Sequence, residues 1–230
     1  ERVKRMVGKK SPAVMADENI SLSISERIAD VLRREIVCAE IDPDAPIKQS
    51  HIAVRFNVSQ APVREALGQL TAERYLLHQA NRGVRVAPLV AAEVLETANL
   101  RITLESELIK AACGLFTAED EMRIASALRK ISKARKVYDL LCANDDFHEA
   151  IYRPADRPIA LELVVQLRAR YSRYLGYMWK HSAHAAVSLE QHNELVALMR
   201  SGHRTKASEF LRRHIQASTD AIIACLGNAG

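Results

Sequence analysis

Residues that end helices or form turns are scarce in this sequence. Of its 230 residues only 8 are glycine and 7 are proline, and aromatic residues make up 5%. Alanine, leucine, arginine and glutamate, which favour helices, are common instead. This composition indicates a mostly α-helical chain, long enough for two modest domains or one large one.

Closely spaced cysteines and long apolar runs are missing as well. The four cysteines are far apart and form no C-x-x-C pair: Cys38, Cys113, Cys142 and Cys225. We expect them to be reduced and buried as small hydrophobic side chains. No apolar run approaches the ~20 residues that cross a bilayer, and no signal peptide is recognisable. We therefore expect a cytoplasmic protein without a membrane partner.

Acidic residues are few in one short segment. The chain has a formal net charge of +5 and a pI of about 9.1. Residues 48–85 alone contain six basic and two acidic residues, which gives a net charge of +4. The positive charge is thus concentrated, which permits nucleic-acid binding without proving it.

The first 88 residues divide into a tail and a tightly punctuated region. Residues 1–20 lack periodicity, and we expect a flexible basic tail. Residues 21–88 contain three segments with apolar residues at helical spacing, then two strand-like runs around the sequence NRG. Ser59 stands at the N-cap position of the third helix. Three helices and a hairpin, with positive charge on the last two elements, describe a winged helix-turn-helix domain.

The rest of the chain, residues 92–226, shows no strand pattern. Its periodicity predicts six helices, at residues 92–114, 117–137, 138–152, 157–180, 186–201 and 204–226. Short connections such as PADRP and SGHR separate them, which is typical of an antiparallel bundle. The predicted fold is therefore mostly α, with an N-terminal winged helix-turn-helix domain and a C-terminal all-α domain.

Polar residues occupy apolar helix faces in this second domain. In the segment ANDDFHEAIY, Asn144 and His148 lie one turn apart beside Phe147. His192 and His214 lie on apolar faces of two other predicted helices. A single inward histidine is usually a hydrogen-bonded core residue. Three in one bundle form a candidate site for a divalent metal such as Zn²⁺ or Ni²⁺.

Two parts of the sequence resemble a known family. The segment VSQAPVREALGQLTAERYLLHQANRGVRVAPL resembles the winged-helix domain of GntR-type bacterial transcription regulators, through S-x-x-P-V-R-E-A-L and R-G-x-x-V. The helical remainder, with FHEAI, QHNELVALM and RRHI, resembles the FCD effector domain of the FadR subfamily. Together the resemblances cover nearly everything after about Ser21. They imply a homodimeric transcription regulator that binds a short inverted repeat in double-stranded DNA.

The third predicted helix should enter the major groove by its N-terminal end. We expect DNA contacts there and on neighbouring elements, from Arg34, Lys48, Arg55, Ser59, Gln60, Ala61, Arg64, Arg82 and Gly83. Arg64 is the best candidate for reading guanine, although pairing with Glu65 or a phosphate is an alternative. Arg82 and Gly83 resemble the wing contacts of the family. The other basic residues suit phosphates or solvent.

The chain departs from the family pattern in this domain. Many members have arginine where Gln60 stands here, and often another near Ser50. Glycine is usual at the positions of Asn57 and Arg74. Asn57 can still adopt a left-handed conformation. The arginine losses leave the operator preference open.

The resemblance also bears on the histidines. Many FCD domains bind a metal through an Asp or Asn one turn before the first of three histidines, and this pattern falls on Asn144, His148, His192 and His214. We expect zinc, with nickel or another divalent ion as alternatives. Because an amide oxygen is a weaker ligand than a carboxylate, Asp145 is a second choice for the oxygen ligand or an outer partner.

An organic acid is the expected effector. A metal with open positions binds carboxylate oxygens, and a nearby arginine adds a charge-assisted pair. Arg101 matches a family position that contacts the effector, while an intrahelical ion pair with Glu105 is an alternative of comparable weight. Arg168 and Tyr171 are further candidates, because their helix is too polar for pure core.

We therefore expect a ligand-responsive repressor that a small carboxylate releases from DNA. The sequence has no H-E-x-x-H, nucleophile elbow or phosphate loop, so we expect no catalytic residues and no enzyme. Two alternatives stay open. One is a helical metalloenzyme fused to a DNA-binding module, and the other is a metal-sensing repressor.

Overall fold

The computed structural model describes residues 22–79, 83–181 and 187–227, which form two compact units. The first contains the described residues up to Arg33 together with Asp44–Ala87, and the second contains Arg34–Pro43 and the chain from Pro88 onward. Helix α1 (Ile24–Val37) contributes residues to both units. The expected fold class, a small winged domain and a helical bundle, is confirmed. The predicted tail, residues 1–20, lies outside the described residues.

After α1, the first unit contains two helices and three short strands. They are β1 (Pro46–Ile47), α2 (Gln49–Phe56), α3 (Gln60–Ala72), β2 (Leu76–Gln79) and β3 (Gly83–Val86). The strands form one antiparallel sheet in the order β1-β3-β2, and Leu76 of β2 pairs with Val86 of β3. Strand β1 is not among the two strand-like runs that the sequence predicts.

The turn between α2 and α3 depends on one residue. Asn57 has φ 53° and ψ 52°, the left-handed conformation that its short polar side chain tolerates. Ser59 stands at the N-cap of α3 as predicted, but its hydroxyl makes no capping hydrogen bond. Inward positions on α3, including Val63 and Leu70, are fully buried. This packing leaves the opposite face of α3 exposed.

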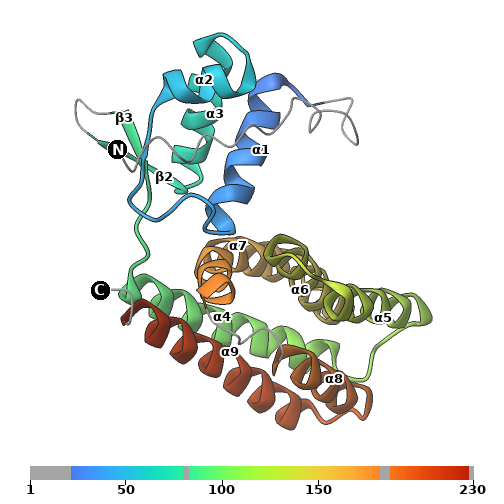
Figure 1. Cartoon of the computed structure of the whole chain (residues 1–230). Coiled ribbons are helices and arrows are strands. Elements are labelled where there is room, and N and C mark those ends of the chain that lie inside the picture. Colours follow the sequence, from blue (N-terminus) through green and yellow to red (C-terminus); the bar gives the residue numbers. More distant parts are fainter. Residues whose placement is uncertain (1–21, 80–82, 182–186, 228–230) are drawn as a thin grey trace. The chain divides into compact units, whose positions relative to one another are not determined.

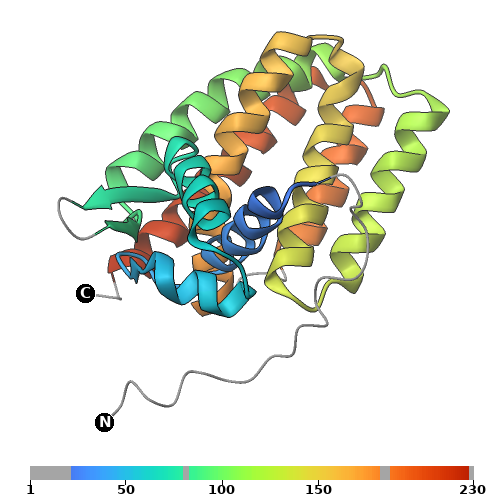
Figure 2. The ribbon, with the colours of Figure 1, turned by 90° about the horizontal axis from the view of Figure 1, so that it is seen from above.

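The second unit is a bundle of long helices. They are α4 (Ala91–Ala112), α5 (Ala118–Lys133), α6 (Val137–Tyr152), α7 (Pro158–His181), α8 (Val187–Arg200) and α9 (Arg204–Gly227), with a 3-10 turn η3 (Arg153–Ala155) after α6. Helix α4 packs along α9 and α7, α6 packs on α5 and α7, and α8 packs on α9 (Figures 1 and 2). The six predicted helices agree with these to within a few residues. No described helix is long and apolar enough to span a membrane.

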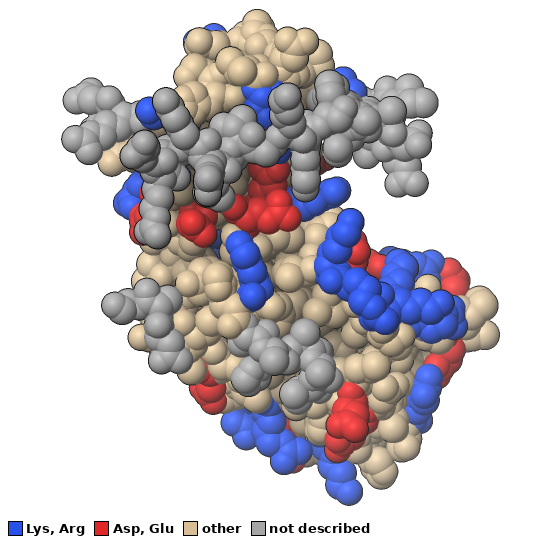
Figure 3. Space-filling model, viewed as in Figure 1, with Lys and Arg blue, Asp and Glu red and all other residues tan. Residues whose placement is uncertain are grey.

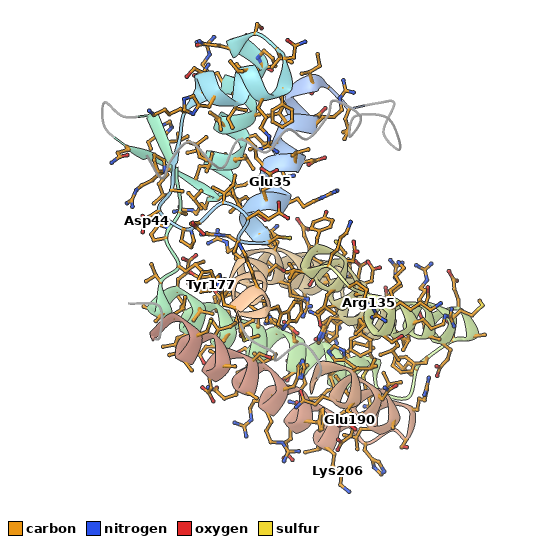
Figure 4. All side chains as sticks on the ribbon, in the orientation of Figure 1. Glu35, Asp44, Arg135, Tyr177, Glu190 and Lys206 are labelled. Carbon is orange, nitrogen blue, oxygen red and sulfur yellow. The ribbon has the colours of Figure 1, made fainter. Side chains whose placement is uncertain are left out.

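The bundle surface is charged and paired. Exposed ion pairs include Lys130–Asp146 and Arg123–Glu119, and Figure 3 shows basic and acidic side chains mixed over this unit. The labelled Lys206 in Figure 4 points outward, whereas side chains fill the space between the helices. The polar residues of this unit that need an explanation are therefore the buried ones in its interior.

The prediction about the cysteines is partly wrong. Cys38 and Cys113 are buried, but Cys142 is exposed and Cys225 is half-buried. All four are free thiols. Cys142 lies on the outer face of α6, one position beyond the buried Leu141. Its apolar neighbours in the sequence therefore do not show that Cys142 itself is buried.

Candidate functional site

The start of α3 presents a polar, exposed surface. Ser59, Gln60, Ala61 and Arg64 are all exposed, while Val63 between them is buried. Gln49 of α2 donates a hydrogen bond of 2.8 Å to the backbone oxygen of Gln60, which holds the two helices together at this end. The four predicted contact residues thus share one accessible helix end, as a major-groove helix requires.

Arg64 is available for an external partner. It makes no ion pair or side-chain hydrogen bond among the described residues, and the alternative pairing with Glu65 is not formed. Lys48 and Arg55 are exposed as well, with the guanidinium of Arg55 5.2 Å from the centre of the Phe56 ring. Arg34 is exposed and lies 4.3 Å over the ring of Tyr138, so it already has a partner within its unit.

The wing is described in part. Both predicted strands are present, and Gly83 opens β3 with φ +86°, a conformation that favours glycine. Arg82 lies outside the described residues.

Three histidines from three helices meet inside the bundle. His148 comes from α6, His192 from α8 and His214 from α9, and one ring nitrogen of each lies within 4.8 Å of the others. The ring centres are 5.1 to 5.8 Å apart. A tetrahedral zinc ion holds such nitrogens about 3.4 Å apart, so small side-chain movements would close the set around an ion.

The three imidazoles are held neutral. Burial lowers the pKa of His148 well below its usual range, and the positive charge of Arg168 adds to this effect. Burial and the neighbouring His214 similarly lower the pKa of His192. Burial, aided by Arg101 and Arg168, lowers the pKa of His214 to about 4. Only neutral imidazole binds a metal, so this donor set fits a divalent ion.

The outer nitrogen of two histidines is hydrogen-bonded. His148 Nδ1 lies 3.0 Å from the hydroxyl oxygen of Tyr152, and His214 Nδ1 lies 2.6 Å from Gln191 Oε1. These contacts leave Nε2 as the ligand atom of both rings. His192 stacks on Phe147 with 4.2 Å between ring centres. Neighbours therefore orient all three rings.

A cavity of about 90 Å³ lies beside the cluster, and the predicted effector residues line it. Its polar wall includes Arg101, Asn144, His148, Arg168, Tyr171 and His214, and its apolar wall includes Leu175, Met178 and Ile215. The described residues thus bring the predicted oxygen ligand, two histidines and both arginines to one space.

The two arginines already have carboxylate partners. Arg101 Nε donates 2.7 Å to Glu105 Oε1, and Arg168 Nη2 donates 2.7 Å to Asp145 Oδ1. The intrahelical pair of Arg101 is therefore formed, and the same residue also lines the cavity. Asp145 is engaged by Arg168 and is not part of the three-histidine group. Arg168 Nε is buried with no hydrogen-bond partner among the described residues.

Two buried polar residues beside the histidines are not among the predicted site residues. Tyr152 contacts His148, and Glu105 accepts from both Tyr152 and Arg101. A usable signal was present, because each lies four residues after a predicted site residue on the same helix face. Glu105 was considered only as the partner that would neutralise Arg101.

Comparison with known proteins supports both units. Residues 24–86 match the family described as bacterial regulatory proteins, gntR family, and residues 96–217 match the FCD domain. The transcriptional repressor RspR of Escherichia coli is 25% identical over 207 residues, covering 89% of this chain and 91% of that protein. The regulator BphR of Paraburkholderia xenovorans is 29% identical over 211 residues, with 87% and 85% covered.

Solved structures share the fold. A GntR transcriptional regulator from Rhodococcus matches with a TM-score of 0.72 at 22% identity, covering 87% of this chain and 97% of that one. McbR of Escherichia coli matches with a TM-score of 0.73 at 21% identity, covering 88% and 98%. Both family matches, in the expected order along the chain, lead to one conclusion. The chain belongs to the GntR family of bacterial regulatory proteins and carries an FCD domain, which makes it a DNA-binding transcription regulator and not an enzyme.

Proposed function

We propose that this regulator is a homodimeric cytoplasmic repressor that a small carboxylate releases from an inverted-repeat operator. The observation that carries the proposal is the cavity where the histidine cluster, Asn144 and two arginines meet. Several relatives of the chain are described as repressors, RspR and GlaR of Escherichia coli among them.

A divalent ion, most simply zinc, would be held by His148, His192 and His214, with Asn144 as a weaker oxygen ligand. When bound, it would supply a positive attachment point for carboxylate oxygens. Asn144 is 5% exposed and lines the cavity. Its amide would complete a four-ligand set or yield its place to the effector.

Charge balance favours an anionic effector. Without metal, Glu105 and Asp145 neutralise Arg101 and Arg168, and the histidines are neutral. A divalent ion would therefore leave the centre with about two uncompensated positive charges. A carboxylate would offset part of this charge and give the unpaired Arg168 Nε an acceptor.

The cavity limits the effector to a small acid. A space of about 90 Å³ is smaller than the 150 Å³ cavity that holds a benzene ring. Its apolar wall, with Leu175, Met178 and Ile215, suits a short hydrocarbon body. The carboxylate of the effector would face the histidines, and its hydrocarbon part would face these apolar side chains.

Operator duplexes selected from a random pool by the purified protein give the test. We expect a two- to four-carbon carboxylate to weaken their binding to zinc-loaded protein, while the matching uncharged amide has no effect. If zinc alone changes operator affinity and no acid does, the protein is a metal sensor. If amides act as well as acids, the charge argument is wrong.

A further inference from the structure

A row of three buried side chains ends on one histidine of the cluster. His148 and Tyr152 lie one turn apart on α6, and Glu105 lies on α4. The hydroxyl of Tyr152 contacts Glu105 Oε2 on one side and His148 Nδ1, at 3.0 Å, on the other. All three side chains are at most 1% exposed, so water does not compete for these contacts.

The charge on Glu105 decides which way the protons point. Arg101 Nε donates to Glu105 Oε1 at 2.7 Å, and Arg168 Nη1 lies 3.8 Å from Glu105 Oε2. Although burial alone would raise the pKa of Glu105, these two guanidinium groups keep the carboxylate ionised and lower that pKa. An ionised carboxylate accepts hydrogen bonds and cannot donate. The hydroxyl proton of Tyr152 must therefore point to Glu105. The contact has one proton to share, and the tyrosine hydroxyl supplies it as the donor to the Glu105 carboxylate.

The hydroxyl oxygen of Tyr152 then faces His148 with a lone pair. If His148 carried its proton on Nε2, two lone pairs would meet across 3.0 Å. With the proton on Nδ1, the ring donates to Tyr152 and its Nε2 is bare. We propose that Glu105 and Tyr152 are positioning residues that set the tautomer of His148 and keep its Nε2 free for a metal ion.

This inference rests on the proposed metal role of the cluster, but its first half concerns the metal-free protein. His214 shows the same orientation through a different group, since its Nδ1 faces the amide oxygen of Gln191 at 2.6 Å. Two of the three rings thus have an acceptor behind them. Partners of this kind raise the metal affinity of the histidines that they orient.

The bundle contains a matched pair that lacks the histidine. Tyr174 on α7 donates a hydrogen bond of 2.7 Å to Glu93 Oε2. It is also buried, at 1% exposed. Tyr174→Phe therefore removes a tyrosine–glutamate hydrogen bond from a buried tyrosine to a half-buried glutamate, without touching the cluster.

The experiment measures the tautomer and the metal affinity separately. Long-range ¹H–¹⁵N correlation spectra of metal-free, ¹⁵N-histidine-labelled protein report which nitrogen of each ring is protonated. We expect His148 to be protonated at Nδ1 in wild-type and Tyr174→Phe protein, and at Nε2 to a large extent in Tyr152→Phe. Zinc affinity, measured by competition with a chelator, should fall about 10- to 100-fold in Tyr152→Phe and less than twofold in Tyr174→Phe.

Glu105→Gln is the second variant and serves if Tyr152→Phe does not fold. An amide can donate to the tyrosine oxygen, so His148 should again lose its fixed Nδ1 proton. The inference is overturned if either folded variant keeps the wild-type tautomer and zinc affinity. Wild-type protein that shows the Nδ1 proton but binds no zinc would confirm the tautomer device and contradict the metal part of the proposed function.

Discussion

At the scale of single residues, the interior of the bundle is organised by charge compensation. Arg101 and Glu105 are buried together, and Arg168 lies 3.8 Å from the same carboxylate. The sequence left two interpretations of Arg101 open, an intrahelical pair and an effector contact. The pair is formed, and the effector contact stays a proposal. A substitution at Arg101 therefore removes a buried ion pair of the fold, independently of any effect on effector binding.

Arg101→Ala should lower the free energy of unfolding by about 3 kcal/mol, because it leaves Glu105 as a buried charge with Arg168 as its remaining ion-pair partner. Urea unfolding of the metal-free protein measures this. Adding Glu105→Gln should recover part of the loss, since the uncompensated charge is then gone. A loss of less than about 1 kcal/mol in the single variant would mean that the pair contributes little.

Arg64→Ala should lose discrimination between operator and mismatched DNA by about 1–3 kcal/mol, since one guanidinium reads one guanine. Competition binding with selected and scrambled duplexes measures the difference. Arg129→Ala, an exposed arginine of the bundle, is the control and should leave discrimination unchanged. Equal losses on both duplexes would assign Arg64 to a phosphate instead of a base.

The histidine cluster predicts a pH dependence. In the unfolded chain histidines titrate near 6.5, whereas burial lowers the pKa of His214 to about 4 in the folded protein, and those of His148 and His192 fall too. As pH drops below 6.5, the unfolded chain takes up protons that the folded protein does not. Urea unfolding of metal-free protein should therefore show stability falling between about pH 6.5 and 4. Constant stability across this range would contradict buried neutral rings.

At the scale of elements, local sequence patterns predict most of the helices and strands. Six bundle helices and the winged domain follow from apolar spacing, turn residues and the resemblance to a family. Strand β1 was missed because two residues, Pro46 and Ile47, are too short to show alternation. The Tyr152–Glu105 contact was missed for a different reason. It joins residues 47 positions apart, and only the packing of α6 beside α4 reveals it.

Helix α5 begins with a capping box, which affects the stability of the protein and not its binding site. Thr117 caps its first turn, and its hydroxyl accepts from the backbone nitrogen of Asp120, whose carboxylate in turn accepts from Thr117. Thr117→Ala should therefore lower the free energy of unfolding by about 1 kcal/mol. Thr103→Ala, at an exposed position inside α4, is the control and should change it by less than about 0.5 kcal/mol. A smaller effect at Thr117 than at Thr103 would rule out the capping role.

At the scale of the whole molecule, the start of α3, which is the proposed DNA-binding surface, and the histidine cluster lie in different units. An effector can release DNA only if it binds the DNA-competent and DNA-incompetent forms with different affinity. Couplings of this kind are typically about 5- to 150-fold.

The basic first unit also predicts that DNA affinity depends strongly on salt. The logarithm of the binding constant should fall with the logarithm of the salt concentration, with a slope near −0.9 for each phosphate neutralised. Binding that ignores salt would argue against the winged domain as the DNA contact.

The most direct test measures operator affinity by fluorescence anisotropy for wild-type protein and His148→Ala, both prepared with the same excess of zinc. Each protein is measured in the presence and in the absence of a small carboxylate. We expect the acid to weaken wild-type binding at least about fivefold and to leave His148→Ala within about twofold of its own acid-free value. Both proteins should bind the operator similarly without acid, because His148 belongs to the second unit. An equal response in both proteins would contradict a role for the histidine cluster in sensing the acid.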